Sequence, residues 1–144
     1  MAELSRRDFI KVGEAAAAAA AIAAIGGPIG AYFYPANLQE QPTEPVLVGA
    51  EADLPVGTSK TVPFGRYPAL VINTPAGLRA YSAVCTHFAC LCVYDPVAKN
   101  ISCPCHAGYF SAEDGSVISG PPPRPLEALT VEVKDGQVYV GGAA

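Results

Sequence analysis

The sequence has 144 residues, which is enough for one domain with a short appendage. Nine basic and thirteen acidic side chains give a net charge of −4. The chain therefore lacks the basic surface that binds nucleic acid through its phosphates, and we expect no nucleic-acid partner.

The first 34 residues combine a basic segment with a long apolar run. Residues 1–11 contain Ser5-Arg6-Arg7-Asp8-Phe9-Ile10-Lys11, and residues 12–34 carry a single charge, Glu14. The seven-residue motif resembles the twin-arginine (Tat) export signal, S-R-R-x-F-L-K, which implies export of a folded protein. As a helix, residues 12–34 would rise roughly 35 Å, enough to span a bilayer core of about 30 Å. We expect a retained, single-pass anchor; cleavage by a signal peptidase is the alternative.

Residues 35–45 follow as a linker with three prolines and no apolar periodicity. This composition predicts an extended, semi-rigid tether. It could serve as a plain spacer or as a hinge that lets the following domain move.

Residues 46–144 show the pattern of an all-β domain. Runs rich in β-branched and aromatic residues alternate with turn residues, and no helical period extends over ten residues. An Asp135-Gly136 pair predicts a hairpin. The predicted strands are Ser59–Phe64, Ala69–Asn73, Leu78–Val84, Leu129–Lys134 and Gln137–Val140.

The five cysteines lie between positions 85 and 105, interleaved with the only two histidines of the chain. Cys85 and His87 form a C-x-H element, and after fifteen intervening residues Cys103 and His106 form a C-x-x-H element. Two Cys and two His suit either a tetrahedral zinc site or a 2Fe–2S cluster in which two imidazoles replace two thiolates. C-x-H is uncommon in zinc ribbons, so the spacing favours the cluster.

The two segments Cys85-Thr86-His87-Phe88-Ala89-Cys90 (box 1) and Cys103-Pro104-Cys105-His106-Ala107-Gly108-Tyr109-Phe110 (box 2) resemble the motifs of Rieske proteins. The resemblance implies an antiparallel β-sandwich with a cluster-binding subdomain, preceded here by the single transmembrane helix. It implies that Cys85 and Cys103 ligate one iron and that His87 and His106 ligate the other.

The same resemblance assigns two further features. Cys90 and Cys105 match the non-ligand cysteines that form a disulfide in the quinol-oxidising branch, a pair that oxygenase ferredoxins lack. Residues 119–126 resemble the family's proline loop, a third wall over the cluster. Cys92 has no family role; it is expected to be a half-buried thiol or an alternative disulfide partner of Cys105.

Three positions depart from the family pattern. Ala89 replaces a glycine, which could alter the shape of box 1. Gly108 and Phe110 replace a serine and a tyrosine whose hydroxyl groups donate hydrogen bonds to the cluster. Such donors stabilise the reduced, more negative state, so their loss predicts a lower reduction potential and a preference for menaquinol.

The resemblance predicts the iron–sulfur subunit of a cytochrome bc-type complex, a quinol:cytochrome c oxidoreductase of the cytoplasmic (inner) membrane. Its head would lie on the periplasmic or outer face. The exposed imidazole of His106 would contact quinol, beside a cytochrome b-type membrane subunit. The electron would then pass to a c-type cytochrome or a copper protein. The alternatives are the Rieske subunit of another exported oxidoreductase, such as arsenite oxidase, and a free-standing electron carrier.

Overall fold

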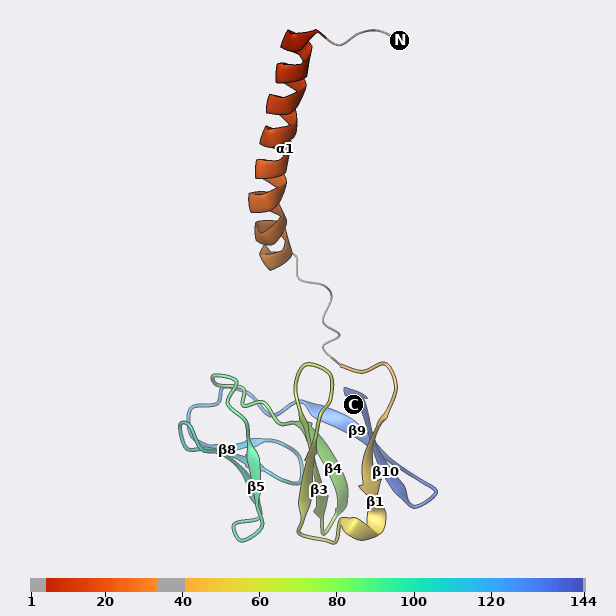
Figure 1. Ribbon diagram of the computed structural model, residues 1–144. Helices are drawn as coiled ribbons and strands as arrows, with labels where there is room; N and C mark the ends of the chain where they lie inside the picture. Colours follow the sequence, from red (N-terminus) through yellow and green to blue (C-terminus); the bar gives the residue numbers. More distant parts are fainter. Residues whose placement is uncertain (1–4, 34–40, 144) are drawn as a thin grey trace. The chain divides into compact units, whose positions relative to one another are not determined.

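A computed structural model describes residues 5–33 and 41–143 of the chain. The described residues form two compact units, an N-terminal helix and a β-rich head (Figure 1).

The N-terminal unit is a single helix of 28 residues, α1 (Arg6–Phe33). Ser5 caps it: the backbone N–H of Asp8 donates to the Ser5 hydroxyl oxygen at 3.2 Å, and that hydroxyl donates to the Asp8 carboxylate at 2.6 Å. At 1.5 Å per residue the helix is about 42 Å long. It is long and apolar enough to cross a membrane, as predicted.

The helix begins earlier than the apolar run does. The predicted span starts at Val12, whereas α1 starts at Arg6, so both arginines of the export motif are helical. Tyr34 and residues 35–40 of the predicted hinge lie outside the described residues. The end of that segment meets the head, where the Gln41 side-chain amide donates to the Glu127 carboxylate at 2.7 Å.

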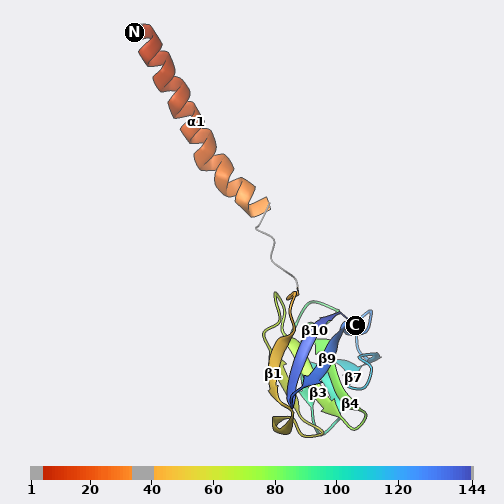
Figure 2. The same cartoon turned by 90° about the vertical axis from the view of Figure 1, so that its right-hand side faces the viewer.

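The head is built on a six-stranded sheet in the order β1-β10-β9-β4-β3-β2, in which every pair is antiparallel (Figure 2). A short 3-10 helix, η1 (Glu51–Asp53), follows the first strand. Asp135 and Gly136 have φ values of 51° and 72°, which suit the tight turn of the predicted β9–β10 hairpin. The strands are β1 (Val46–Ala50), β2 (Ser59–Val62), β3 (Ala69–Thr74), β4 (Gly77–Ser82), β9 (Ala128–Lys134) and β10 (Gln137–Ala143).

A second, four-stranded antiparallel sheet is inserted between β4 and β9 and lies beside the large sheet (Figure 1). Its order is β5-β6-β7-β8. Box 1 precedes β5, and box 2 spans the turn between β6 and β7. The strands are β5 (Val93–Asp95), β6 (Asn100–Cys103), β7 (Gly108–Ser111) and β8 (Val117–Ser119). The all-β fold with a separate cluster-binding subdomain is therefore confirmed.

Strand β3 separates two hydrophobic cores, because its side chains alternate between the two faces of the sheet. Ala69 and Val71 pack with apolar side chains of the other large-sheet strands. Leu70 and Ile72 instead pack with Ile101 and Phe110 of the small sheet and with the buried cysteines. The buried cysteines of the site thus pack against a strand in which every residue but Asn73 is buried.

The predicted strands are present, with shifted ends. Strand β2 ends at Val62 rather than Phe64, and Pro63 has no N–H to continue the ladder. Strand β4 ends at Ser82 rather than Val84, whose backbone instead bridges to Leu91. The prediction missed strand β1 and the four strands of the small sheet.

Candidate metal centre

Box 1 is a closed loop at the end of strand β4. An antiparallel bridge joins Val84 to Leu91, and the Cys85 N–H donates to the Cys90 carbonyl at 2.8 Å. A further bond, from the Ala89 N–H to the Cys85 carbonyl at 3.0 Å, tightens the turn between them. Ala89 has a φ of 55°, so this alanine adopts the left-handed conformation that suits the glycine of the family pattern.

Box 2 is the turn of the β6–β7 hairpin. Cys103 and Gly108 are paired across the two strands, and residues 104–107 form the turn between them. Ala107 also has a positive φ, 50°. Each box therefore holds its residues on a short turn whose ends are fixed by strand pairing.

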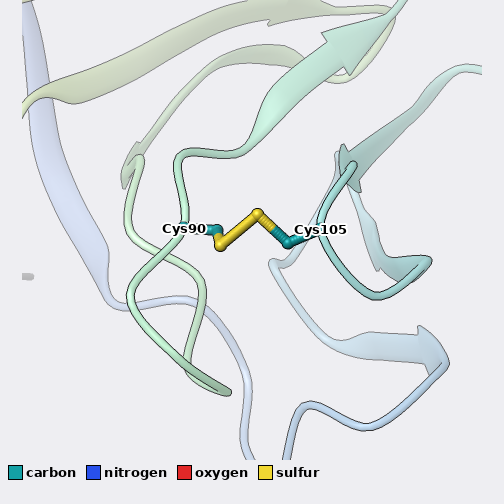
Figure 3. The surroundings of a disulfide bond; sticks show 2 residues. All are labelled: Cys90 and Cys105. Atoms are coloured by element: carbon teal, nitrogen blue, oxygen red, sulfur yellow. A yellow bond between two sulfur atoms is a disulfide. The ribbon is translucent and has the colours of Figure 1, made fainter.

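A disulfide joins the two boxes. Cys90 of box 1 and Cys105 of box 2 are bonded, with 6.5 Å between their Cα atoms, and the bond crosses the space between the two loops (Figure 3). The predicted Cys90–Cys105 disulfide is confirmed. Cys92 is free, so the alternative pairing of Cys92 with Cys105 is wrong.

The remaining three cysteines form a buried group of sulfur atoms. The Sγ atoms of Cys85, Cys92 and Cys103 all lie within 4.8 Å of one another, and each residue is at most 3% exposed. Cys92 is therefore fully buried rather than half-buried as expected. Burial, and to a lesser degree the neighbouring Cys103 and Cys85, raises the pKa of the Cys92 thiol well above its usual range.

The two histidines lie side by side. The imidazole centroids of His87 and His106 are 4.9 Å apart, with the ring planes at 88°. Nδ1 of His87 is buried and has no hydrogen-bond partner, whereas His106 is exposed. A buried imidazole nitrogen without a partner is costly unless it binds something, and imidazole nitrogen is a metal ligand. The paired thiols and the paired imidazoles thus fit a metal group with mixed ligands.

A third segment, residues 119–126, packs against both boxes as the prediction of a proline loop required. The Thr86 hydroxyl donates to the Arg124 carbonyl at 2.6 Å. A Cβ at Gly108 would lie 2.7 Å from Pro122 Cγ, so the serine of the family pattern would force this loop to move. Box 1 and this loop also border an open groove of about 830 Å³.

Two loops joined by a disulfide offer two thiols and two imidazoles, a donor set that suits an iron–sulfur cluster with mixed cysteine and histidine ligands. Residues 44–135 match the family model described as the Rieske [2Fe-2S] domain, and residues 3–24 match that of the twin-arginine translocation pathway signal sequence. The chain belongs to the Rieske family and carries a Tat signal. Its cofactor is a Rieske-type 2Fe–2S cluster.

Several known proteins resemble this chain. The cytochrome b6-f complex iron-sulfur subunit of Chlorobaculum tepidum is 37% identical over 78% of the chain, and the match covers 62% of that protein. The corresponding subunit of Gloeobacter violaceus is 30% identical over 95% of the chain and 82% of its own length. In structure, the plasma membrane Rieske protein PetC3 of Synechocystis PCC 6803 aligns with a TM-score of 0.62 at 27% identity, over 67% of this chain and 99% of that one. The chain spans less than two thirds of the length of the first two curated relatives that it matches.

The prediction missed two features of the site. One is Cys92 beside the two cysteines predicted as ligands, and the other is the packing of Pro122 on Gly108. Each depends on how the loops pack against one another rather than on a spacing motif. The one signal for Cys92 in the sequence is its position two residues after Cys90. In the structure this position follows the bridge that closes box 1, and the Cys92 N–H donates to the Ala83 carbonyl at 2.8 Å.

Proposed function

We propose that this chain is the electron-transfer subunit of a cytochrome bc-type complex that oxidises quinol. The observation that carries the proposal is the Cys90–Cys105 disulfide between the two boxes, the feature expected of the quinol-oxidising branch. The names of the relatives support it, since both curated proteins described above are cytochrome b6-f complex iron-sulfur subunits.

In this proposal, Cys85 and Cys103 hold one iron and His87 and His106 hold the other. The proximity of the two thiols and the unpartnered Nδ1 of His87 support the assignment. When bound, the cluster supplies a one-electron acceptor between the two boxes. The disulfide and the proline loop keep the ligand loops in place and limit the access of water.

His106 is the residue proposed to meet quinol. Its side chain is exposed, so its outer nitrogen can accept a hydrogen bond and then a proton from a quinol hydroxyl group. Phe88, which is 72% exposed with its ring centroid 6.0 Å from that of His106, offers an apolar surface for the quinol ring.

The N-terminal unit would anchor the head to the membrane. Helix α1 is long enough to span the cytoplasmic membrane, and the arginines of the export motif would keep its start on the cytoplasmic side. The head would work on the outer face, beside a cytochrome b-type subunit, and deliver electrons to a c-type cytochrome or a copper protein. Residues 35–45 would act as the hinge for that transfer.

The test is the reduction of the cluster by a menaquinol analogue in membranes that contain the full chain. We expect reduction that a quinol-site inhibitor blocks and that Phe88→Ala slows without loss of cluster. Val97→Ala is the matched control, because Val97 is 91% exposed in the turn between β5 and β6 and should leave the rate unchanged. A cluster that dithionite reduces but menaquinol does not would contradict the proposal.

A further inference from the structure

Cys92 is a third buried thiol beside the two proposed thiolate ligands. Its Sγ lies within 4.8 Å of the Sγ atoms of both Cys85 and Cys103, and the residue is 2% exposed. The bond from its N–H to the Ala83 carbonyl and the neighbouring Val84–Leu91 bridge fix its backbone. These backbone interactions at the base of box 1 therefore hold the thiol beside the ligand pair.

Cys92 is surplus to the ligand set. A 2Fe–2S cluster takes two protein ligands on each iron, and the proposed function already provides two thiolates and two imidazoles. Cys92 also forms no disulfide. Its remaining chemical property is an S–H group, which is a weak hydrogen-bond donor.

The core around the ligand cysteines offers few other side-chain donors. Among its buried members, the Tyr81 hydroxyl is occupied, since it donates to the Ala112 carbonyl at 3.2 Å. Phe110 is fully buried in the same core and has no hydroxyl group. Apart from the cysteines, the other buried members carry hydrocarbon side chains.

We propose that Cys92 is a potential-tuning residue whose single S–H donates a hydrogen bond to one of the two neighbouring ligand thiolates, Cys85 or Cys103. A donor to a ligand sulfur stabilises the reduced cluster, which is the more negative state. Cys92 thereby supplies, from the end of box 1, part of the hydrogen bonding to the cluster that Gly108 and Phe110 cannot supply from box 2. The inference rests on the ligand pair of the proposed function.

The test compares two variants of the full chain in detergent by redox titration of the cluster. Cys92→Val removes the donor while filling nearly the same volume, and it should lower the equilibrium constant for reduction about threefold to tenfold, or roughly 28 to 59 mV for one electron. Cys92→Ser keeps a donor and should stay within about twofold of wild type. If Cys92 only filled space, valine would be the harmless substitution and serine the disruptive one.

Two further measurements make the result specific. Ile101→Val trims a fully buried side chain of the same core and should leave the midpoint unchanged. Pulsed EPR of the reduced wild type should show an exchangeable-proton coupling that Cys92→Val lacks.

A wild-type midpoint in Cys92→Val, an equal fall in both Cys92 variants, or loss of the cluster in Cys92→Val would each overturn the inference. None of these outcomes depends on quinol or on a partner subunit. Failure of the proposed function would instead appear as absent quinol reduction, or as a wild-type EPR signal without histidine nitrogens.

Discussion

Removal of the disulfide between the boxes should lower the stability of the head by a predictable amount. The bond between Cys90 and Cys105 closes a loop with a sequence separation of 15. Loop-closure entropy in the unfolded chain assigns such a crosslink about 3 kcal/mol. For a head of this size, 1 kcal/mol corresponds to about 4–8 °C in Tm. The double variant Cys90→Ala/Cys105→Ala should therefore melt about 12–24 °C below wild type.

The assay follows the visible circular dichroism of the cluster and the far-ultraviolet signal of the full chain at one heating rate. Because Cys105 is exposed, a phosphine reductant should reach the bond and lower the Tm of the wild type by a similar amount. The double variant serves as the control, since the reductant should have no further effect on it. A Tm within a few degrees of wild type, or a variant that the reductant still destabilises, would refute the reasoning.

Two further predictions concern the proline loop and the reduction potential. In thermal melts, Gly120→Ala should lower the free energy of unfolding by about 1–3 kcal/mol more than Gly57→Ala does. Both glycines have positive φ, 95° and 87°, but a Cβ at Gly120 would lie 2.5 Å from the Ala107 carbonyl oxygen, while one at Gly57 would meet nothing within 4 Å. Equal costs would contradict close packing of this loop on box 2. Redox titration of the wild type should give a midpoint in the lower half of the roughly −150 to +300 mV range of Rieske centres, because Gly108 and Phe110 lack donors; a midpoint near its upper end would contradict this.

The framework of the head could be predicted because it depends on local signals. Alternating apolar residues and the Asp135-Gly136 turn located the hairpin of β9 and β10. Strand β1 was missed, and its register shifts between Leu47 and Gly49, so that its pairing does not follow a simple alternation. The strands of the small sheet are only three or four residues long, too short for a periodic pattern to stand out.

The site shows the same division between local and tertiary information. The spacing of cysteines and histidines marked both boxes, and the resemblance to the Rieske family supplied the disulfide partners. The position of Cys92 depends on how box 1 folds back on strand β4, and the contact of Pro122 with Gly108 joins segments that meet only in the tertiary structure. Contacts of this kind produce no characteristic residue spacing that could be recognised in a single sequence.

The central claim, that two cysteines and the only two histidines of the chain ligate the cluster, can be tested directly by isotope labelling. Growth with [15N]-histidine labels only His87 and His106. Pulsed EPR of the reduced full chain should then show two strongly coupled histidine nitrogens that change from 14N to 15N, and His106→Ala should abolish the characteristic signal. A spectrum that does not respond to labelling, or a signal that survives in His106→Ala, would contradict the ligand assignment.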